Sequence, residues 1–86
     1  MEEAITSSYL KWLKHEFENS PFWKHMGISF ERLEPGDVMI RMPAKNELMN
    51  SNNVMHGGAI ASMLDSIIGA TIRSTREVRV ATISLT

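Results

Sequence analysis

Hydrophobic positions near the start of the chain follow the period of an α-helix. The apolar residues that recur at four-residue steps, among charged neighbours, are Ile5, Tyr9, Leu13 and Phe17. This spacing predicts an amphipathic helix with one buried face. Asn19, Ser20 and Pro21 are expected to end it.

A second, shorter helix is expected from Pro21 to Met26. Proline suits the first turn of a helix, where its missing N–H is not needed, and Ser20 before it is a good N-cap. Gly27 marks the end of this helix. Phe22 and Trp23 are expected to pack against the core.

Between Ile28 and Met42 the period changes to two, which is typical of β-strands. Apolar and polar positions alternate in two runs, one on each side of the tetrapeptide Glu34-Pro35-Gly36-Asp37. Pro in the second position and Gly in the third match a type II turn. The region is expected to form a β-hairpin, and one long strand with a short break is the alternative.

The remaining chain predicts a loop, a long helix and a strand. Residues 43–53 are polar, rich in Asn and without a sustained period, which indicates a loop. The run from Gly57 to Ile72 is apolar almost all round, and its length favours a helix that is buried on most sides. The run from Val78 to Leu85 is β-branched and alternating, which predicts a strand.

These elements predict an α+β fold with too little sheet. Two or three strands cannot enclose a helix that is apolar all round. Residues 1–86 are therefore expected to be a single but partial domain, with residues 1–26 as an N-terminal helical segment. Strands borrowed from a neighbouring chain in an oligomer are the alternative.

The composition excludes several classes of function. A net charge of −1 with scattered Lys and Arg provides no basic face for nucleic acid. No apolar run approaches the roughly 20 residues that span a bilayer, and Glu2 and Glu3 stand where a signal peptide has basic residues. We therefore expect a cytoplasmic protein with no membrane partner. The short chain has no cysteine for disulfides, so association between copies is expected.

Asp65 is the only ionisable residue between Gly57 and Ile72. Burying a carboxylate costs free energy unless a partner replaces the lost water, which makes Asp65 a candidate for catalysis. The alternative is structural: Asp65 and Ser66 would lie on a narrow solvent-facing stripe or cap a second helix segment. From the residues alone, the two interpretations have equal weight.

The tripeptide His56-Gly57-Gly58 stands at the start of the same helix. Two glycines leave backbone N–H groups unobstructed at the positive end of the helix dipole, where a carbonyl oxygen is stabilised as it becomes an oxyanion. The simpler interpretation is a tight turn into the helix, with His56 as a hydrogen-bonded structural residue. When the tripeptide is considered alone, the simpler interpretation is favoured.

The separation of these two features requires two chains. Gly57 and Asp65 are eight positions apart, or about 12 Å of helical rise, which is too far for both to act on one carbonyl. A two-fold dimer with antiparallel helices would bring Gly57 of one copy towards Asp65 of the other.

Asn50, His56-Gly57-Gly58 and Asp65, at these spacings, resemble the HGG motif of hotdog-fold thioesterases of the phenylacetate-degradation (PaaI-like) branch. The resemblance extends from about Phe22 onward, and the combined spacing is more specific than HGG alone. It implies a hotdog fold, an antiparallel sheet wrapped around a long central helix, here present as its N-terminal part. It also implies hydrolysis of an acyl-coenzyme A or a related acyl thioester by a homodimer or homotetramer, without a cofactor.

The same resemblance implies a role for each matched residue. Asp65 is expected to act as general base for water or as nucleophile, and the Gly57 amide to polarise the carbonyl across the dimer interface. Asn50 would position water or substrate, and His56 would hold the loop and the helix start. Thr82 falls where relatives carry a hydroxyl near the attacking water.

The sequence does not specify the acyl group. Gly58, Thr82 and Met55 are the expected substrate contacts. Apolar residues that would line an acyl pocket, or are plain core, are Met49, Val54, Met55, Ile60 and Met63. Basic residues that would meet the phosphates of coenzyme A, or are ordinary solvated charges, are Lys45, Arg73, Arg76 and Arg79.

The chain departs from the family pattern in two respects. Asn53 stands where many relatives have Gly, but Asn tolerates positive φ, so the turn is expected to survive. The C-terminal half, which in the family supplies three more strands, is not among the 86 residues.

Other functions fit the sequence less well. An α/β-hydrolase would need a G-x-S-x-G nucleophile elbow, which the sequence lacks. No metal site is expected, since His15, His25 and His56 do not share a helical face. The serious alternative is a hotdog module that binds an acyl thioester without hydrolysing it, or an inactive truncated domain.

Overall fold

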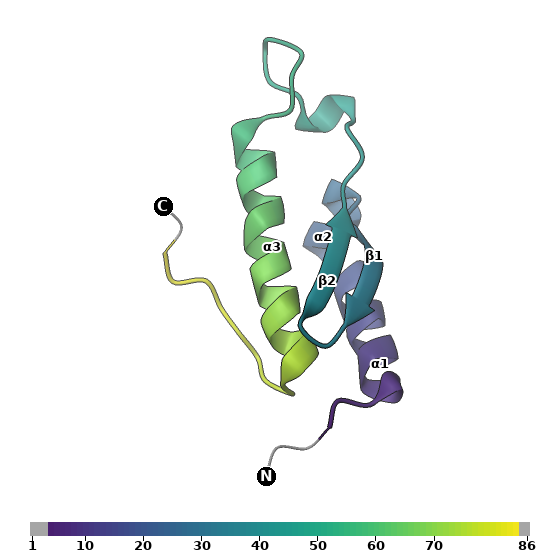
Figure 1. Cartoon of the computed structure of the whole chain (residues 1–86). Coiled ribbons are helices and arrows are strands. Elements are labelled where there is room, and N and C mark those ends of the chain that lie inside the picture. The colour runs from purple at the N-terminus through teal and green to yellow at the C-terminus, as the bar shows by residue number, and fades with distance from the viewer. Residues whose placement is uncertain (1–3, 85–86) are drawn as a thin grey trace.

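The computed structural model describes residues 4–84 of the chain. Two helices are followed by a two-stranded antiparallel hairpin, a short 3₁₀ turn and a long helix (Figure 1). β2 packs against α3, and β1 packs against α1. The elements are α1 Ser7–Glu18, α2 Pro21–Met26, β1 Ser29–Glu34, β2 Asp37–Arg41, η1 Asn46–Leu48 and α3 Gly57–Thr75.

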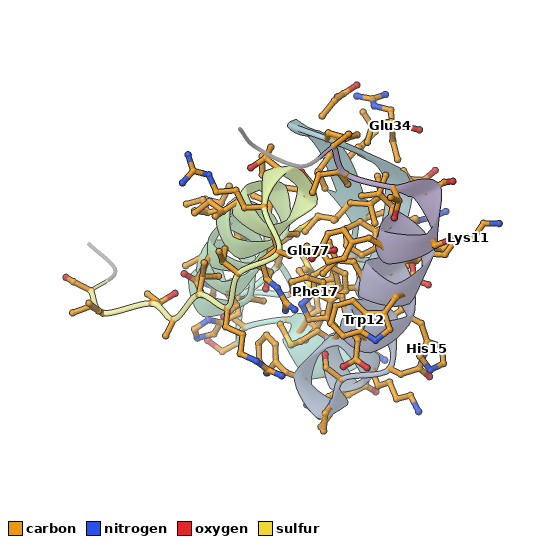
Figure 2. All side chains as sticks on the ribbon, turned by 90° about the horizontal axis from the view of Figure 1, so that it is seen from below. Lys11, Trp12, His15, Phe17, Glu34 and Glu77 are labelled. Carbon is orange, nitrogen blue, oxygen red and sulfur yellow. The ribbon has the colours of Figure 1, made fainter. Side chains whose placement is uncertain are left out.

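The predicted amphipathic helix is confirmed as α1. Thr6 before it is extended, and its Oγ1 accepts a hydrogen bond from the Tyr9 amide at 3.0 Å, which satisfies one of the N–H groups that a helix start leaves unpaired. Leu13 is fully buried. Phe17 points into the interior, whereas Lys11 points outward (Figure 2).

The short helix α2 has the predicted bounds. Pro21 lies in its first turn, and Gly27 ends it with a φ of 75°, a left-handed conformation that favours glycine. Ser20 is the N-cap residue, but its hydroxyl donates to a carbonyl of α1 instead of capping α2. Trp23 is buried as predicted, whereas Phe22 is 48% exposed. The prediction for Phe22 is wrong because so short a helix turns only one side to the core.

β1 and β2 form the predicted hairpin, so the alternative of one long strand is excluded. The pairing runs from Ser29 opposite Arg41 to Glu34 opposite Asp37, with one irregularity of register inside β1. Gly36 in the turn has a φ of 72°, which is the conformation that the third position of a type II turn requires.

The core lies where α1, α2, the hairpin and the start of α3 meet. Its buried residues are Trp23, Met26, Ile28, Leu48 and Ala59. The rings of Phe17, Trp23 and Phe30 contact one another with centroid separations of 4.8 to 5.8 Å, which is the range of favourable aromatic pairs. This aromatic cluster joins α1 and α2 to β1.

Two hydrogen bonds between side chains and backbone fix the hairpin to the helices. Glu18 at the end of α1 accepts from the Phe30 amide at 2.8 Å. Ser74, which is fully buried in the last turn of α3, accepts from the Gly36 amide at 2.9 Å and donates to the Thr71 carbonyl at 2.6 Å. The hairpin turn is therefore held against the C-terminal end of α3.

The long helix α3 is closely packed on one side only, against the hairpin and α1, and residues 76–84 pass loosely over part of another side. A stripe of apolar residues at four-residue steps is exposed, and it consists of Ile60 (47%), Leu64 (59%), Ile68 (58%) and Ile72 (41%). The prediction that this helix is buried on most sides is therefore wrong for residues 4–84, because the hairpin and α1 cover a single face. Within the same residues, no helix combines the length and the hydropathy needed to cross a membrane.

The strand predicted from Val78 to Leu85 does not form in the described part of that range. Residues 76–84 are irregular, and Leu85 lies outside the described residues. The segment folds back along α3 on the side away from the hairpin (Figure 1), so no strand lies beside it to share backbone hydrogen bonds. High β-propensity does not make a strand without a pairing partner.

Removal of the Ser74 hydroxyl is expected to destabilise the fold. Ser74→Ala should lower the free energy of unfolding by about 1 kcal/mol, because the Gly36 amide would lose its acceptor. Thr75→Ala is the matched control, since the exposed Thr75 hydroxyl only bonds a carbonyl of its own helix. Urea denaturation measures both, and equal losses in the two variants would contradict the assignment.

Candidate functional site

The predicted site residues lie in two places along α3. His56, Gly57 and Gly58 form its N-terminal end, beside the loop that holds Asn50. Asp65 lies in the middle of the helix, where the segment 76–84 passes over it. Since the two places are about 12 Å apart along the helix axis, one copy of the chain does not bring them together.

His56 is the N-cap of α3 and uses an unusual acceptor. Its Nδ1 accepts a hydrogen bond from the Gly58 amide at 2.8 Å, which means that this ring nitrogen carries no proton. A Cβ on Gly58 would lie 2.9 Å from that Nδ1, which is closer than real contacts allow. The second glycine of the motif is therefore required by the histidine cap.

Gly57 differs from Gly58 both in the space around its Cα and in the use of its amide. A Cβ added to Gly57 would meet nothing within 4 Å, so the residue faces open space. Within residues 4–84 its amide donates no hydrogen bond, since those that cap the helix come from Gly58, Ala59 and Ile60. The Gly57 N–H is thus the amide of this helix start that is free to bind a carbonyl oxygen.

Asn50 organises the loop before α3. Its side-chain oxygen accepts from the Asn52 amide at 2.9 Å and from the Val54 amide at 3.3 Å, the pattern by which Asn folds its own backbone into a turn. Asn53 has a φ of 59°, which confirms the prediction that Asn replaces Gly there without loss of the turn. Asn50 therefore shapes the route from η1 to the helix start.

Asp65 is half-buried and has one polar partner in the described chain. The Thr82 hydroxyl donates a hydrogen bond to its Oδ1, and Oδ2 accepts none from residues 4–84. The contact brings together two residues whose roles were expected from the resemblance, although seventeen positions separate them. The other carboxylate oxygen is thus available to a water molecule or a substrate.

Asp65 and Thr82 open into a cavity of about 240 Å³ between α3 and the segment that folds over it. Besides Asp65, Thr82 and Ser84, its wall is apolar and consists of Ile68, Gly69, Ile72, Val80, Ala81 and Ile83. Small molecules bind in cavities of this kind, where a few polar groups stand on an apolar wall. The cavity is a candidate substrate site.

Gly69 is a residue of this site that sequence reasoning missed. A Cβ on it would lie 3.4 Å from a methyl group of Val80, an ordinary van der Waals contact, so the folded-back segment packs directly against the helix here. A glycine inside a helix pattern is the signal that was available, because it is costly there unless something packs close to it.

The expected apolar pocket residues divide between different surfaces. Ile60 and Met63 line a second cavity of about 290 Å³ between α3 and β2, together with Val38 and Met39. Met55 pairs with Met49 in an isolated β-bridge beneath the Asn50 loop, and Val54 is exposed. None of the five residues expected to line an acyl pocket, Met49, Val54, Met55, Ile60 and Met63, lines the Asp65 cavity.

Comparison with known proteins places the chain in a family. Residues 11–84 match the family model described as "Domain of unknown function (DUF4442)". The chain belongs to the DUF4442 family. Over 60 residues, the DUF4442 chain is 32% identical to the Thermoplasma acidophilum protein named "Putative esterase Ta0293". That alignment covers 70% of this chain and 46% of the other protein, so the chain spans about half the length of the curated relative.

A solved structure supports the fold. The DUF4442 chain is similar to the X-ray structure of a protein from the thioesterase superfamily, with a TM-score of 0.78 and 21% sequence identity. The match covers 91% of this chain and 61% of that one. The expected α+β fold, the hotdog arrangement of a small antiparallel sheet against a long helix, is thereby confirmed.

The two glycines are expected to respond differently to substitution. Gly58→Ala should lower the free energy of unfolding relative to Gly57→Ala by about 1 kcal/mol, the usual value of a helix cap, because its Cβ displaces the His56 ring. A double-mutant cycle with His56→Ala tests the cause. In the His56→Ala background the cost of Gly58→Ala should vanish, and an undiminished cost there would contradict the proposed clash.

Proposed function

We propose that this DUF4442 chain carries half of a thioesterase active site and takes part in the hydrolysis of an acyl-coenzyme A or a related acyl thioester. The observation that carries the proposal is the pair formed by Asp65 and Thr82 in a mainly apolar cavity. Support also comes from a relative named as an esterase and from the thioesterase-superfamily fold. By its motif, the chain resembles the PaaI-like branch.

Asp65 is the residue that acts on the thioester. In the general-base form of the mechanism, its free oxygen takes a proton from water while the water oxygen attacks the carbonyl carbon. In the nucleophilic form, the carboxylate itself attacks, and water later hydrolyses the resulting anhydride. In both forms the carbon–sulfur bond breaks, the thiolate leaves and takes up a proton, and the free acid is released.

Thr82 has a positioning role in this mechanism. A hydroxyl that donates to Oδ1 fixes the rotation of the carboxylate, so that Oδ2 points at the reacting group. Because the donor is on the folded-back segment and the acceptor is on α3, the geometry depends on how that segment packs. Val80 of that segment packs against α3 at Gly69.

The carbonyl oxygen requires a donor from a second copy. The Gly57 amide has no partner among residues 4–84 and faces open space, but it is about 12 Å along the helix from Asp65 of its own chain. A homodimer, or a homotetramer built from such dimers, supplies the Gly57 amide of one copy to the thioester held by Asp65 of the other. His56 and Asn50 keep that amide in place, through the cap and the loop turn.

The acyl chain is assigned to the cavity beside Asp65. This cavity has a volume of about 240 Å³ and a mainly apolar wall, which suit a small aryl or short acyl group. The glycine Gly58, expected as a substrate contact, has its amide engaged by His56, so Gly58 contributes only a small surface near the oxyanion. Met55 stands beneath the loop and is assigned no contact with the acyl group.

Replacement of Asp65 tests the proposal directly. Asp65→Asn should reduce kcat for acyl-coenzyme A hydrolysis by a factor of about 10² to 10⁴, because an amide accepts no proton from water. Asp37→Asn is the matched control, since Asp37 is an exposed carboxylate paired with Arg32 on the hairpin. Thiol release is followed with a colorimetric dye, on this chain and on any longer reading frame that contains it.

The outcomes of that assay separate the enzyme from its alternative. Full activity in Asp65→Asn would remove this residue from the mechanism. A folded wild-type protein that binds acyl-coenzyme A but releases no thiol would support the non-catalytic binding module instead.

Thr82→Val is expected to lower kcat by about tenfold, with little change in KM. Valine keeps the shape of threonine but cannot donate to Asp65, and a hydrogen bond to a charged group contributes about 1.5–3 kcal/mol. Thr82→Ser keeps the hydroxyl and should restore most of the rate. If Thr82→Ser is as slow as Thr82→Val, the hydroxyl has no positioning role.

A further inference from the structure

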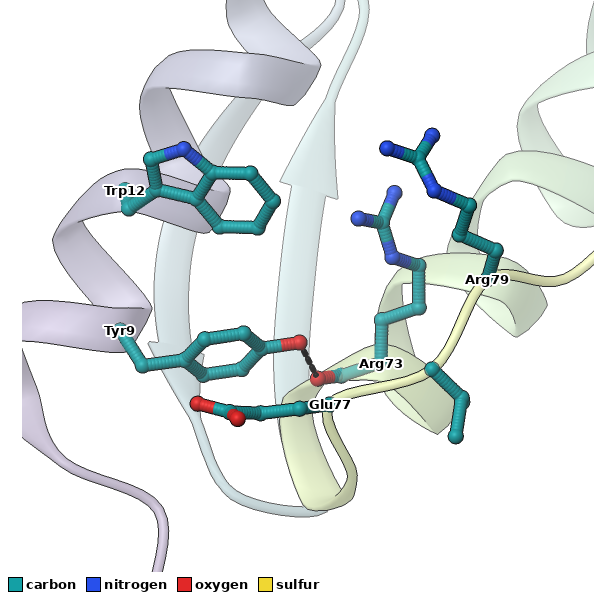
Figure 3. A pocket seen from close by; sticks show the side chains of 6 residues that line it. Tyr9, Trp12, Arg73, Glu77 and Arg79 are labelled. Carbon is teal, nitrogen blue, oxygen red and sulfur yellow. Dashed lines mark hydrogen bonds between the residues drawn. The ribbon is translucent and has the colours of Figure 1, made fainter.

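A third cavity lies between α1 and the C-terminal end of α3, away from the Asp65 cavity. Its volume is about 320 Å³, and it is lined by Tyr9, Trp12, Arg73, Glu77, Val78 and Arg79 (Figure 3). This volume is at the lower end of the range for small-molecule sites. None of the residues that line it has a role in the chemical steps proposed above.

Two guanidinium groups dominate the charge of this cavity. Arg73 on α3 and Arg79 on the segment after it project side by side in the same direction (Figure 3). Neither belongs to the two ion pairs of residues 4–84, which join Arg32 to Asp37 and Arg41 to Glu31. Two adjacent positive charges without a carboxylate repel each other, so an anion between them would be stabilised.

Arg73 is held in place with an unused donor. Its guanidinium carbon lies 5.2 Å from the ring centre of Phe17 and 5.9 Å from that of Trp12, which is within the range of cation–π contacts. Its Nε atom is buried and has no hydrogen-bond partner in the described part of the chain. An unpaired buried donor costs free energy, so Arg73 keeps this position at some cost to the fold.

The two groups that oppose an anion here are neutralised or turned away. The carbonyl groups at the C-terminal end of a helix carry partial negative charge, but the Tyr9 hydroxyl donates to those of Arg73 at 2.7 Å and Arg76 at 3.1 Å. The Glu77 carboxylate lies beside the Tyr9 ring and points away from both guanidinium groups (Figure 3). The basic end of the cavity is therefore separated from its acidic end.

We infer that this cavity binds the phosphate group of a phosphorylated small molecule, with Arg73 and Arg79 as its ligands. A guanidinium fork matches two phosphate oxygens, and a phosphate monoester has both the charge and the oxygens to engage two forks. A single carboxylate would neutralise only one of the two arginines. The rings of Tyr9 and Trp12 beside them provide an apolar wall for the organic part of the ligand.

One source of the phosphate is the substrate itself, and this assignment rests on the function proposed above. Arg73 is eight residues beyond Asp65 on α3, or about 12 Å along the helix, and Arg79 is on the same segment as Thr82. A thioester carrier with a phosphorylated nucleotide end would span this distance. The other source is a free phosphorylated molecule that binds independently of hydrolysis.

The binding is tested by calorimetric titration of the whole chain. The ligands are adenosine 3′,5′-bisphosphate and, separately, inorganic phosphate. The wild type should bind the nucleotide, and Arg79→Gln and Arg73→Lys should each weaken it by about tenfold or more, the effect of losing a charged hydrogen bond. Arg41→Gln is the matched control, because it removes one arginine that is paired with Glu31. Absence of binding by the wild type, or equal affinity in Arg79→Gln, would overturn the inference.

Kinetics distinguish the two sources of phosphate. If the phosphate belongs to the substrate, Arg79→Gln should raise KM for an acyl-coenzyme A and leave KM unchanged for the matching acyl-N-acetylcysteamine, which has no phosphate. If the phosphate belongs to a free ligand, binding is weakened but neither KM changes. Since the titration does not depend on turnover, failure of the proposed hydrolysis would leave the binding result intact.

Discussion

A helix that is apolar around most of its circumference has to be covered on every side, and in residues 4–84 only one side of α3 is closely packed. β2 and α1 pack against that side, where Ala59, Ala70 and Ser74 are buried. A neighbouring stripe, from Ile60 to Ile72, remains exposed. Full burial of a large aliphatic side chain is worth about 1.5–3 kcal/mol, so covering four such residues is a large contribution to the stability of any assembly that contains this chain.

The helices and the hairpin could be predicted from the sequence because local signals determine them. Thr6, Pro21 and Gly27 mark helix ends by their own backbone preferences. Pro35-Gly36 specifies the type of hairpin turn locally, and Ser74 of α3 then stabilises that turn through the Gly36 amide. The segment after α3 has equally strong local signals, and the prediction of a strand there was wrong. A strand depends on a neighbour, and the hairpin lies on the other side of α3, so propensity alone could not decide the outcome.

The part of the candidate site that lies on one continuous segment of the chain was predictable from the sequence. His56, Gly57 and Asp65 are on α3 or at its start, so their separation follows from helix geometry alone. The contact between Asp65 and Thr82 could only be expected from the family resemblance, because it depends on how the segment folds back. The cavity that contains Arg73 and Arg79 could not be predicted for the same reason, since α1, α3 and that segment each contribute residues to it.

The two glycines at the start of α3 have different structural roles. Gly58 gives its amide to His56 and lacks a side chain because the imidazole occupies that space. Gly57 keeps its amide free and faces open space, where another molecule can approach. The cap thus fixes the direction of an amide that its own chain does not use. Under the proposed mechanism, this amide acts together with Asp65 of a second copy. The contact that completes the active site would therefore also place that second copy against a chain whose α3 stripe is exposed. Catalysis and burial of the apolar helix would then depend on assembly for the same reason: one copy of these residues supplies only part of each.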